Sequence, residues 1–153
     1  MSRVQLALNV NDLDEAVAFY SKLFGTEPAK RRPGYANFAI TEPPLKLVLL
    51  ENPGQGGSLN HLGVEVDGTG AVNAEQTRLA ATGLALADER DTTCCYAKQD
   101  KFWVKDAPDG ESWEFYTVLE DSATFYGQDD SQACCGGSAG SAAGTAAAGT
   151  SCC

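Results

Sequence analysis

The six cysteines of the chain all occur in adjacent pairs: Cys94-Cys95, Cys134-Cys135 and Cys152-Cys153. Random placement would give only about 0.2 such pairs in a chain of this length, so the pairing is a chemical signal. Neighbouring Cα atoms lie about 3.8 Å apart, which is shorter than the usual disulfide range, and a bond within a pair would be strained. We therefore expect reduced thiols in a reducing compartment rather than a secreted disulfide scaffold. Two thiolates together would select a soft, thiophilic centre.

The pair Cys94-Cys95 lies between two strand candidates and is flanked by mostly charged or polar residues at 88–91 and 98–101. This setting favours an exposed loop, and we expect residues 88–98 to be less ordered than the strands until a ligand binds. In a regular strand the two side chains would diverge, so both thiols can bind one atom only where the backbone is irregular. The alternative is a pair of small buried hydrophobic residues, a role that cysteine often has.

A second group, Gln5, His61 and Glu114, predicts a metal site. Strand alternation places Gln5 and His61 at matching positions of two similar strands. Each is followed on its face by a small residue, Ala7 or Gly63, which leaves room for an ion. One imidazole, one carboxylate and one amide oxygen suit Fe(II) or Mn(II), with open positions for substrate or O₂. The alternative is that His61 is a structural residue of its strand.

These side chains are carried by a pattern of elements that occurs twice. Asp12 to Glu15 is typical of a helix start, and Gly25 is typical of a helix end. The strand–helix–strands order repeats after about 56 residues, which indicates an internal duplication. Asp109-Gly110 predicts a hairpin turn between the last two strands. The expected helices cover residues 13–24 and 70–82, and the expected strands cover 4–10, 35–40, 45–51, 60–66, 84–88, 96–97, 101–105 and 112–119.

Composition narrows the class of protein further. The chain has 153 residues, of which 43% are hydrophobic, and a formal net charge of −10. This acidity argues against nucleic acid or anionic lipid as a partner. No apolar run is long enough to span a membrane and the N-terminus does not resemble a signal peptide, so we expect a soluble cytoplasmic protein. Residues 1–126 are expected to form one domain, with modules at about 1–54 and 58–119. The low-complexity tail at 127–153 is expected to be disordered, above all from Gly136 onward.

Several short segments resemble the ArsI-type carbon–arsenic lyases of the vicinal oxygen chelate superfamily. The resemblance covers roughly residues 3–126, and it becomes specific when Asn60-His61-Leu62-Gly63 is combined with Thr92-Thr93-Cys94-Cys95. The remaining similar segments are Gln5 to Val10, Ala18 to Tyr20, Leu23 to Gly25, Gly34 to Ile40, Leu45 to Glu51 and Trp113 to Tyr116.

The resemblance implies an α+β fold of two βαβββ modules that form a pair of half-barrels around a metal site. It implies Fe(II) at Gln5, His61 and Glu114, and trivalent arsenic held by Cys94 and Cys95. The implied reaction uses O₂ to cleave the C–As bond of a trivalent organoarsenical such as methylarsonous acid. The products are arsenite and, from a methyl group, formaldehyde.

This sequence departs from the wider superfamily at two ligand positions. Many members have histidine where Gln5 stands, and a neutral amide binds metal more weakly. Many also take a fourth ligand from the last strand of the first module. That position falls near Leu47, which cannot coordinate, and Glu51 further along the strand is only a reserve candidate.

Two alternative functions remain open from the residues alone. One is another metal-dependent enzyme of this superfamily, of the glyoxalase or dioxygenase type, which needs no thiol pair. The other is a non-catalytic resistance protein that binds a drug or an arsenical. The tail cysteines Cys134, Cys135, Cys152 and Cys153 would either capture and pass on arsenicals or be exposed thiols without a role.

Overall fold

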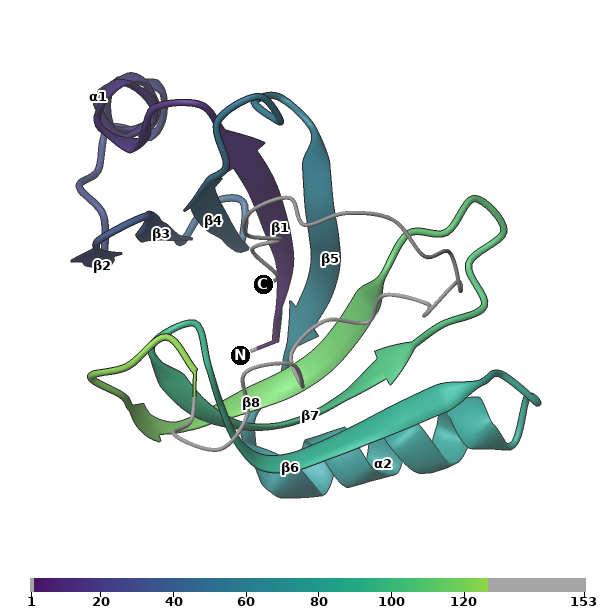
Figure 1. The fold of residues 1–153 in the computed structure, drawn as a ribbon. Coiled ribbons are helices and arrows are strands. Elements are labelled where there is room, and N and C mark those ends of the chain that lie inside the picture. The colour runs from purple at the N-terminus through teal and green to yellow at the C-terminus, as the bar shows by residue number, and fades with distance from the viewer. Residues whose placement is uncertain (1, 127–153) are drawn as a thin grey trace.

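A computed structural model describes residues 2–126, which form one eight-stranded mixed sheet and two helices. The strand order is β2-β3-β4-β1-β5-β8-β7-β6. The sheet curls strongly, and both helices lie on its outer side (Figure 1). The expectations for the tail fall outside the described residues. Within residues 2–126, no helix is both long enough and apolar enough to cross a membrane.

The first βαβββ unit contains β1 (Arg3–Val10), α1 (Leu13–Phe24), β2 (Lys30–Arg32), β3 (Tyr35–Ile40) and β4 (Leu45–Glu51). The helix begins where the Asp12 carboxylate accepts a hydrogen bond from the Glu15 backbone N–H at 2.9 Å. It ends at Gly25, whose φ of 63° suits a residue without a side chain. Leu13 and Val17 of this helix pack against Phe38 and other apolar side chains on the outer face of the sheet.

The second unit repeats the order with β5 (Leu59–Glu65), α2 (Gly68–Ala80), β6 (Leu86–Cys94), β7 (Ala97–Val104) and β8 (Trp113–Asp121). At the start of helix α2 the Gly68 backbone N–H donates to Thr117 Oγ1 at 3.1 Å, and Val72 is the one buried residue of the helix. Val72 packs with Phe102 and its neighbours in a separate core cluster. Each helix therefore covers the outer face of its own half of the sheet, and the inner face is left for the site.

The centre of the sheet joins the two units and sets the position of the site. Strand β1 pairs with β5 in antiparallel fashion, and the parallel partner of β5 is β8. This register places Gln5 opposite Gly63, and Gly63 opposite Glu114. A Cβ atom on Gly63 would lie 3.0 Å from Glu114 Cγ and 3.3 Å from Gln5 Cβ. Glycine at this position is therefore what allows the two side chains to meet.

The expectation of an exposed loop around the first cysteine pair was wrong. Strands β6 and β7 are paired up to Cys94 and Ala97, and a two-residue turn of Cys95 and Tyr96 joins them. Both turn residues have positive φ, 56° and 60°, as the tightest hairpins require. Neither is a glycine or asparagine, so the usual sequence signal of such a turn is missing.

Candidate active site

The side chains of Gln5, His61 and Glu114 meet on the inner face of the sheet, as strand alternation predicted. All three are buried. Gln5 Nε2 lies 3.0 Å from His61 Nε2 and donates to Glu114 Oε1 at 2.7 Å. His61 Nε2 and Glu114 Oε1 are 3.3 Å apart. One terminal polar atom from each residue thus faces a common point.

These separations fit a small divalent metal ion. Ligands about 2.1 Å from an octahedral ion and at right angles to one another lie about 3 Å apart. One imidazole, one carboxylate and one amide oxygen would leave positions open, as in non-haem iron sites, although the Gln5 atom that faces His61 and Glu114 in the structure is the amide nitrogen. No group of three His, Cys, Asp or Glu side chains within residues 2–126 could hold a metal. A metal at this point therefore needs the Gln5 amide.

A buried lysine fixes the charge of the carboxylate in this group. Lys101 Nζ lies 3.3 Å from Glu114 Oε2 and 3.6 Å from Glu89 Oε2. Burial alone would raise the pKa of Glu114, but the charge of Lys101 outweighs it and lowers that pKa to about 2. Burial raises the pKa of Glu89, which Lys101 counteracts only in part. Glu114 is thus held as a carboxylate, the form that can bind a cation.

The imidazole of His61 is oriented by an amide. His61 Nδ1 lies 2.7 Å from Asn60 Oδ1, and Asn60 Nδ2 donates to Asn9 Oδ1 at 2.9 Å. Asn9 Oδ1 also accepts from Asn52 Nδ2 at 2.6 Å, which fixes the direction of the chain of amides. Nδ1 must therefore carry the proton, and the lone pair of Nε2 faces Gln5 and Glu114.

The structure resolves the question of a fourth ligand in the first unit. Leu47 packs in the outer core cluster beneath α1, and the adjacent Val48 faces the inner pocket instead. Glu51 accepts a hydrogen bond from the Leu13 backbone N–H at 3.0 Å and so caps α1 away from the site. Neither Val48 nor Glu51 can supply a fourth ligand, and the reserve role for Glu51 was wrong.

The thiol pair lies at the hairpin turn between β6 and β7. Cys94 is buried and Cys95 is half-buried, and their sulfur atoms are 3.2 Å apart. The positive φ of Cys95 turns its side chain back towards that of Cys94, so the expectation of an irregular backbone at this pair is confirmed. The expectation of reduced thiols was wrong for Cys94, whose sulfur is disulfide-bonded, whereas Cys95 is a thiol, so a site made of two thiols belongs to the reduced protein.

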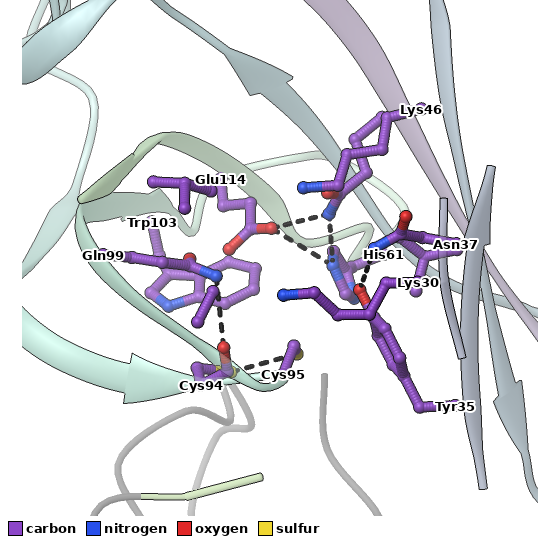
Figure 2. A pocket seen from close by; sticks show the side chains of 14 residues that line it. Lys30, Tyr35, Asn37, Lys46, His61, Cys94, Cys95, Gln99, Trp103 and Glu114 are labelled. Atoms are coloured by element: carbon purple, nitrogen blue, oxygen red, sulfur yellow. Dashed lines mark hydrogen bonds and ion pairs between the residues drawn. The ribbon is translucent and has the colours of Figure 1, made fainter. Parts of the chain in front are cut away.

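Both groups line one pocket, which is the central feature of the inner face (Figure 2). In the view of Figure 2, Gln99 lies between the cysteines and Glu114. Gln99 Nε2 donates to the Cys94 carbonyl at 3.2 Å. Its Oε1 atom is buried and has no hydrogen-bond partner among the described residues. The remaining polar or aromatic residues of the lining are Lys30, Tyr35, Asn37, Lys46 and Trp103.

The sequence reasoning missed these other lining residues. In β7 the alternation of Gln99, Lys101 and Trp103 would have placed them on one face, but no pattern shows that this face is the inner one. Lys46 was equally hidden, because it is a single charge within an apolar strand. Its burial lowers its pKa, and the nearby Glu65 carboxylate acts in the opposite direction. Only the folded structure shows that Lys46 of the first unit is paired with Glu65 of the second.

The fold and site together agree with the comparison to known proteins. Residues 3–115 match the Glyoxalase/Bleomycin resistance protein/Dioxygenase superfamily, and the chain belongs to this family. It is 56% identical to a trivalent organoarsenical cleaving enzyme from Thermomonospora curvata, over 100% of both chains. It is also 67% identical to the cadmium-induced protein CadI from Mycobacterium tuberculosis, over 82% of each chain.

Solved structures support the fold. Methylmalonyl-CoA epimerase from Mycobacterium tuberculosis superposes with a TM-score of 0.53 at 17% identity, over 74% of this chain and 85% of that one. At this identity the likeness concerns architecture only. The curled mixed sheet with two outer helices is therefore the family fold, and the resemblance to organoarsenical-cleaving enzymes is confirmed.

Proposed function

We propose that the protein is an Fe(II)- and O₂-dependent lyase that cleaves the C–As bond of trivalent organoarsenicals such as methylarsonous acid. The observation that carries this proposal is that a thiol pair and a possible metal-binding triad line the same pocket. Each group alone has several uses, but an arsenical needs the first and an oxidative cleavage needs the second. The identity to an organoarsenical-cleaving enzyme along the full chain supports the same reading.

The cysteines hold the substrate. Each thiol of Cys94 and Cys95 replaces one hydroxyl on arsenic and releases one water, so the arsenical remains attached through two As–S bonds with its organic group intact. Soft thiolates bind trivalent arsenic in preference to hard cations. An arsenical attached to this hairpin is already in the pocket, which raises its effective concentration relative to the reacting groups.

The overall reaction balances with one O₂. Methylarsonous acid and O₂ together contain the atoms of formaldehyde and arsenite: one oxygen atom goes to carbon and the other to arsenic. Iron held by Gln5, His61 and Glu114 would supply the redox chemistry that makes O₂ reactive. Lys101 keeps Glu114 ionised and Asn60 keeps His61 in the required tautomer.

A second candidate function is the sequestration of a soft metal cation. The 67% identity to a protein named for its induction by cadmium favours it. Cd(II) is thiophilic, and Cys94 and Cys95 could bind it without any chemistry at the triad. Other enzymes of this family remain a third possibility, since they would need the triad but not the thiols.

Arsenic speciation separates these functions. Reduced protein loaded with Fe(II) is incubated in air with methylarsonous acid, and the arsenic species are quantified over time. We expect more than one equivalent of arsenite per protein. Methylarsonous acid that stays bound and unchanged would indicate a binding protein. Full turnover of another family substrate by the Cys94→Ser, Cys95→Ser double variant would indicate a different enzyme.

A further inference from the structure

The hydroxyl of Tyr116 lies between two hydrogen-bond acceptors, the amide oxygen of Gln5 and a carboxylate oxygen of Glu65. Tyr116 Oη lies 2.5 Å from Gln5 Oε1 and 3.2 Å from Glu65 Oε2. A hydroxyl carries one proton, so it can donate fully to only one of them. Tyr116 is completely buried.

The same Gln5 amide directs its NH₂ group at the triad. Gln5 Nε2 contacts both Glu114 Oε1 and His61 Nε2, at 2.7 and 3.0 Å. The three side chains therefore pair with one another. An NH₂ group has no lone pair to offer a metal, and only the amide oxygen can be a ligand. The orientation that the structure shows is therefore incompatible with metal binding.

We propose that the Gln5 amide turns over when metal binds, and that Tyr116 and Glu65 hold it in the turned position. This inference rests on the proposed metal site. After the turn, Gln5 Oε1 faces the ion, and Gln5 Nε2 donates to Tyr116 Oη. The Tyr116 hydroxyl then donates its hydrogen bond to Glu65 Oε2. Without a cation, the turned amide oxygen would face Glu114 Oε1 at close range, so the ion itself decides between the two positions.

The Glu65 carboxylate is well placed to accept the hydrogen bond from Tyr116. Its carboxylate is fixed by Arg3 Nε at 2.9 Å and by Lys46 Nζ at 3.6 Å. Burial would raise the pKa of Glu65, but Lys46 and Arg3 outweigh it and lower that pKa. Glu65 is thus an ionised hydrogen-bond acceptor at a fixed position, and the Tyr116 hydroxyl links it to Gln5. Tyr116 and Glu65 are positioning residues, since neither faces the ion.

The hydroxyl makes one full hydrogen bond in the metal-free arrangement and two in the metal-loaded one. Tyr116→Phe should therefore weaken Mn(II) binding, measured by electron paramagnetic resonance, about 10- to 100-fold, as for other partners of metal ligands. Glu65→Gln should weaken it less, because a neutral amide oxygen can still accept. Thr117→Val is the matched control: it removes another buried hydroxyl of β8, whose partner is the Gly68 backbone N–H, and should leave Mn(II) affinity unchanged.

Gln5→Glu tests the turn itself. A carboxylate has two identical oxygens, so one can face the ion while the other accepts from Tyr116, with or without metal. In this background, Tyr116→Phe should change Mn(II) affinity by less than about twofold, because the hydroxyl makes the same contacts in both states. If Tyr116→Phe lowered Mn(II) affinity equally in both backgrounds, the amide would not turn, and Tyr116 would only hydrogen-bond to residue 5.

Nuclear Overhauser contacts of the Gln5 side-chain NH₂ provide a readout that needs no variant. In metal-free protein these protons should contact the His61 ring. In protein saturated with Zn(II), a diamagnetic ion, they should contact the Tyr116 ring instead. Unchanged contacts with Zn(II) bound would refute the inference while leaving the metal site intact. Failure of the wild-type protein to bind Mn(II) or Zn(II) at the triad would refute both.

Discussion

At the scale of single residues, the proposed function gives the thiols and the triad separate tasks. Replacing Cys94 or Cys95 by serine substitutes a hard, neutral hydroxyl for a soft thiolate and removes one arm of a chelate. We expect the affinity for methylarsonous acid to fall roughly 100-fold or more. Fe(II) binding should survive, because the triad comes from other strands. Arsenical titration and iron analysis on the same reduced samples check both statements.

The matched control for this pair is Cys152→Ser, the same chemical change in the tail. It should leave both affinities near those of the wild-type protein. The assignment of roles would be reversed if Cys94→Ser lost iron and kept the arsenical.

The charge of Glu114 predicts a pH dependence of stability in metal-free protein. The pKa of Glu114 is about 2 in the fold and returns to its ordinary value of 4.5 on unfolding. Because the folded value is the lower one, this contribution is complete above about pH 4.5 and is lost as the pH falls towards 2. The difference corresponds to roughly 3 kcal/mol at about 1.4 kcal/mol per pH unit.

Denaturant unfolding between pH 5 and pH 2 measures this effect. Glu114→Gln should flatten the decline relative to wild type, whereas Glu27→Gln, the same change at an exposed position, should not. Identical pH profiles for Glu114→Gln and wild type would show that Lys101 does not hold the carboxylate ionised.

At the scale of elements, the sequence predicted what depends on local chemistry. The first helix was predicted to the residue, because its N-cap, its apolar spacing and its final glycine agree. Strands β3 and β4 were also predicted with their observed bounds. Strand β2 was missed and β6 was placed too short, since Lys30–Arg32 and the polar half of Leu86–Cys94 carry no apolar alternation. Those segments become strands only through pairing with a neighbour.

Gly63 shows how a strand position controls the site. An added methyl group would lie 3.0 Å from Glu114 Cγ and 3.3 Å from Gln5 Cβ, so Gly63→Ala must displace at least one of them. We expect Mn(II) affinity to fall about 10-fold or more, within the range seen when the support of a metal ligand is disturbed.

The control is Gly70→Ala on helix α2, where an added Cβ would meet nothing within 4 Å. It should keep metal affinity and raise stability by up to about 1 kcal/mol, since alanine favours a helix. If Gly63→Ala bound Mn(II) with wild-type affinity, the close packing of residue 63 against Gln5 and Glu114 would not control the site.

At the scale of the whole molecule, the site exists only because the two units meet. Gln5 comes from the first unit and His61 and Glu114 from the second, and strand alternation was enough to group them. The ion pairs of Lys101 with Glu89 and Glu114 could not be predicted, because sequence does not show which faces become enclosed. The same holds for Tyr116 and Glu65, whose importance depends on distances across the sheet.

The domain boundary yields a prediction at the same scale. Truncation after Tyr126 keeps all ten helices and strands of the described residues. We expect the shortened protein to fold with nearly the same melting temperature as the full chain, both reduced, and to retain much of the turnover, as checked by circular dichroism and arsenic speciation. A protein that fails to fold would show that the tail is structural.

The central claim is that the thiols and the triad act on one arsenical within one pocket. Single-turnover arsenite formation tests it directly, with His61→Ala, Cys94→Ser and an equimolar mixture of the two, all reduced and incubated with Fe(II) in air. Wild type should release about one equivalent of arsenite, in line with a single site per chain. The two variants should release none, either alone or mixed, because an arsenical held in one chain cannot reach the triad of another. Arsenite from the mixture, or from Cys94→Ser alone, would contradict the account.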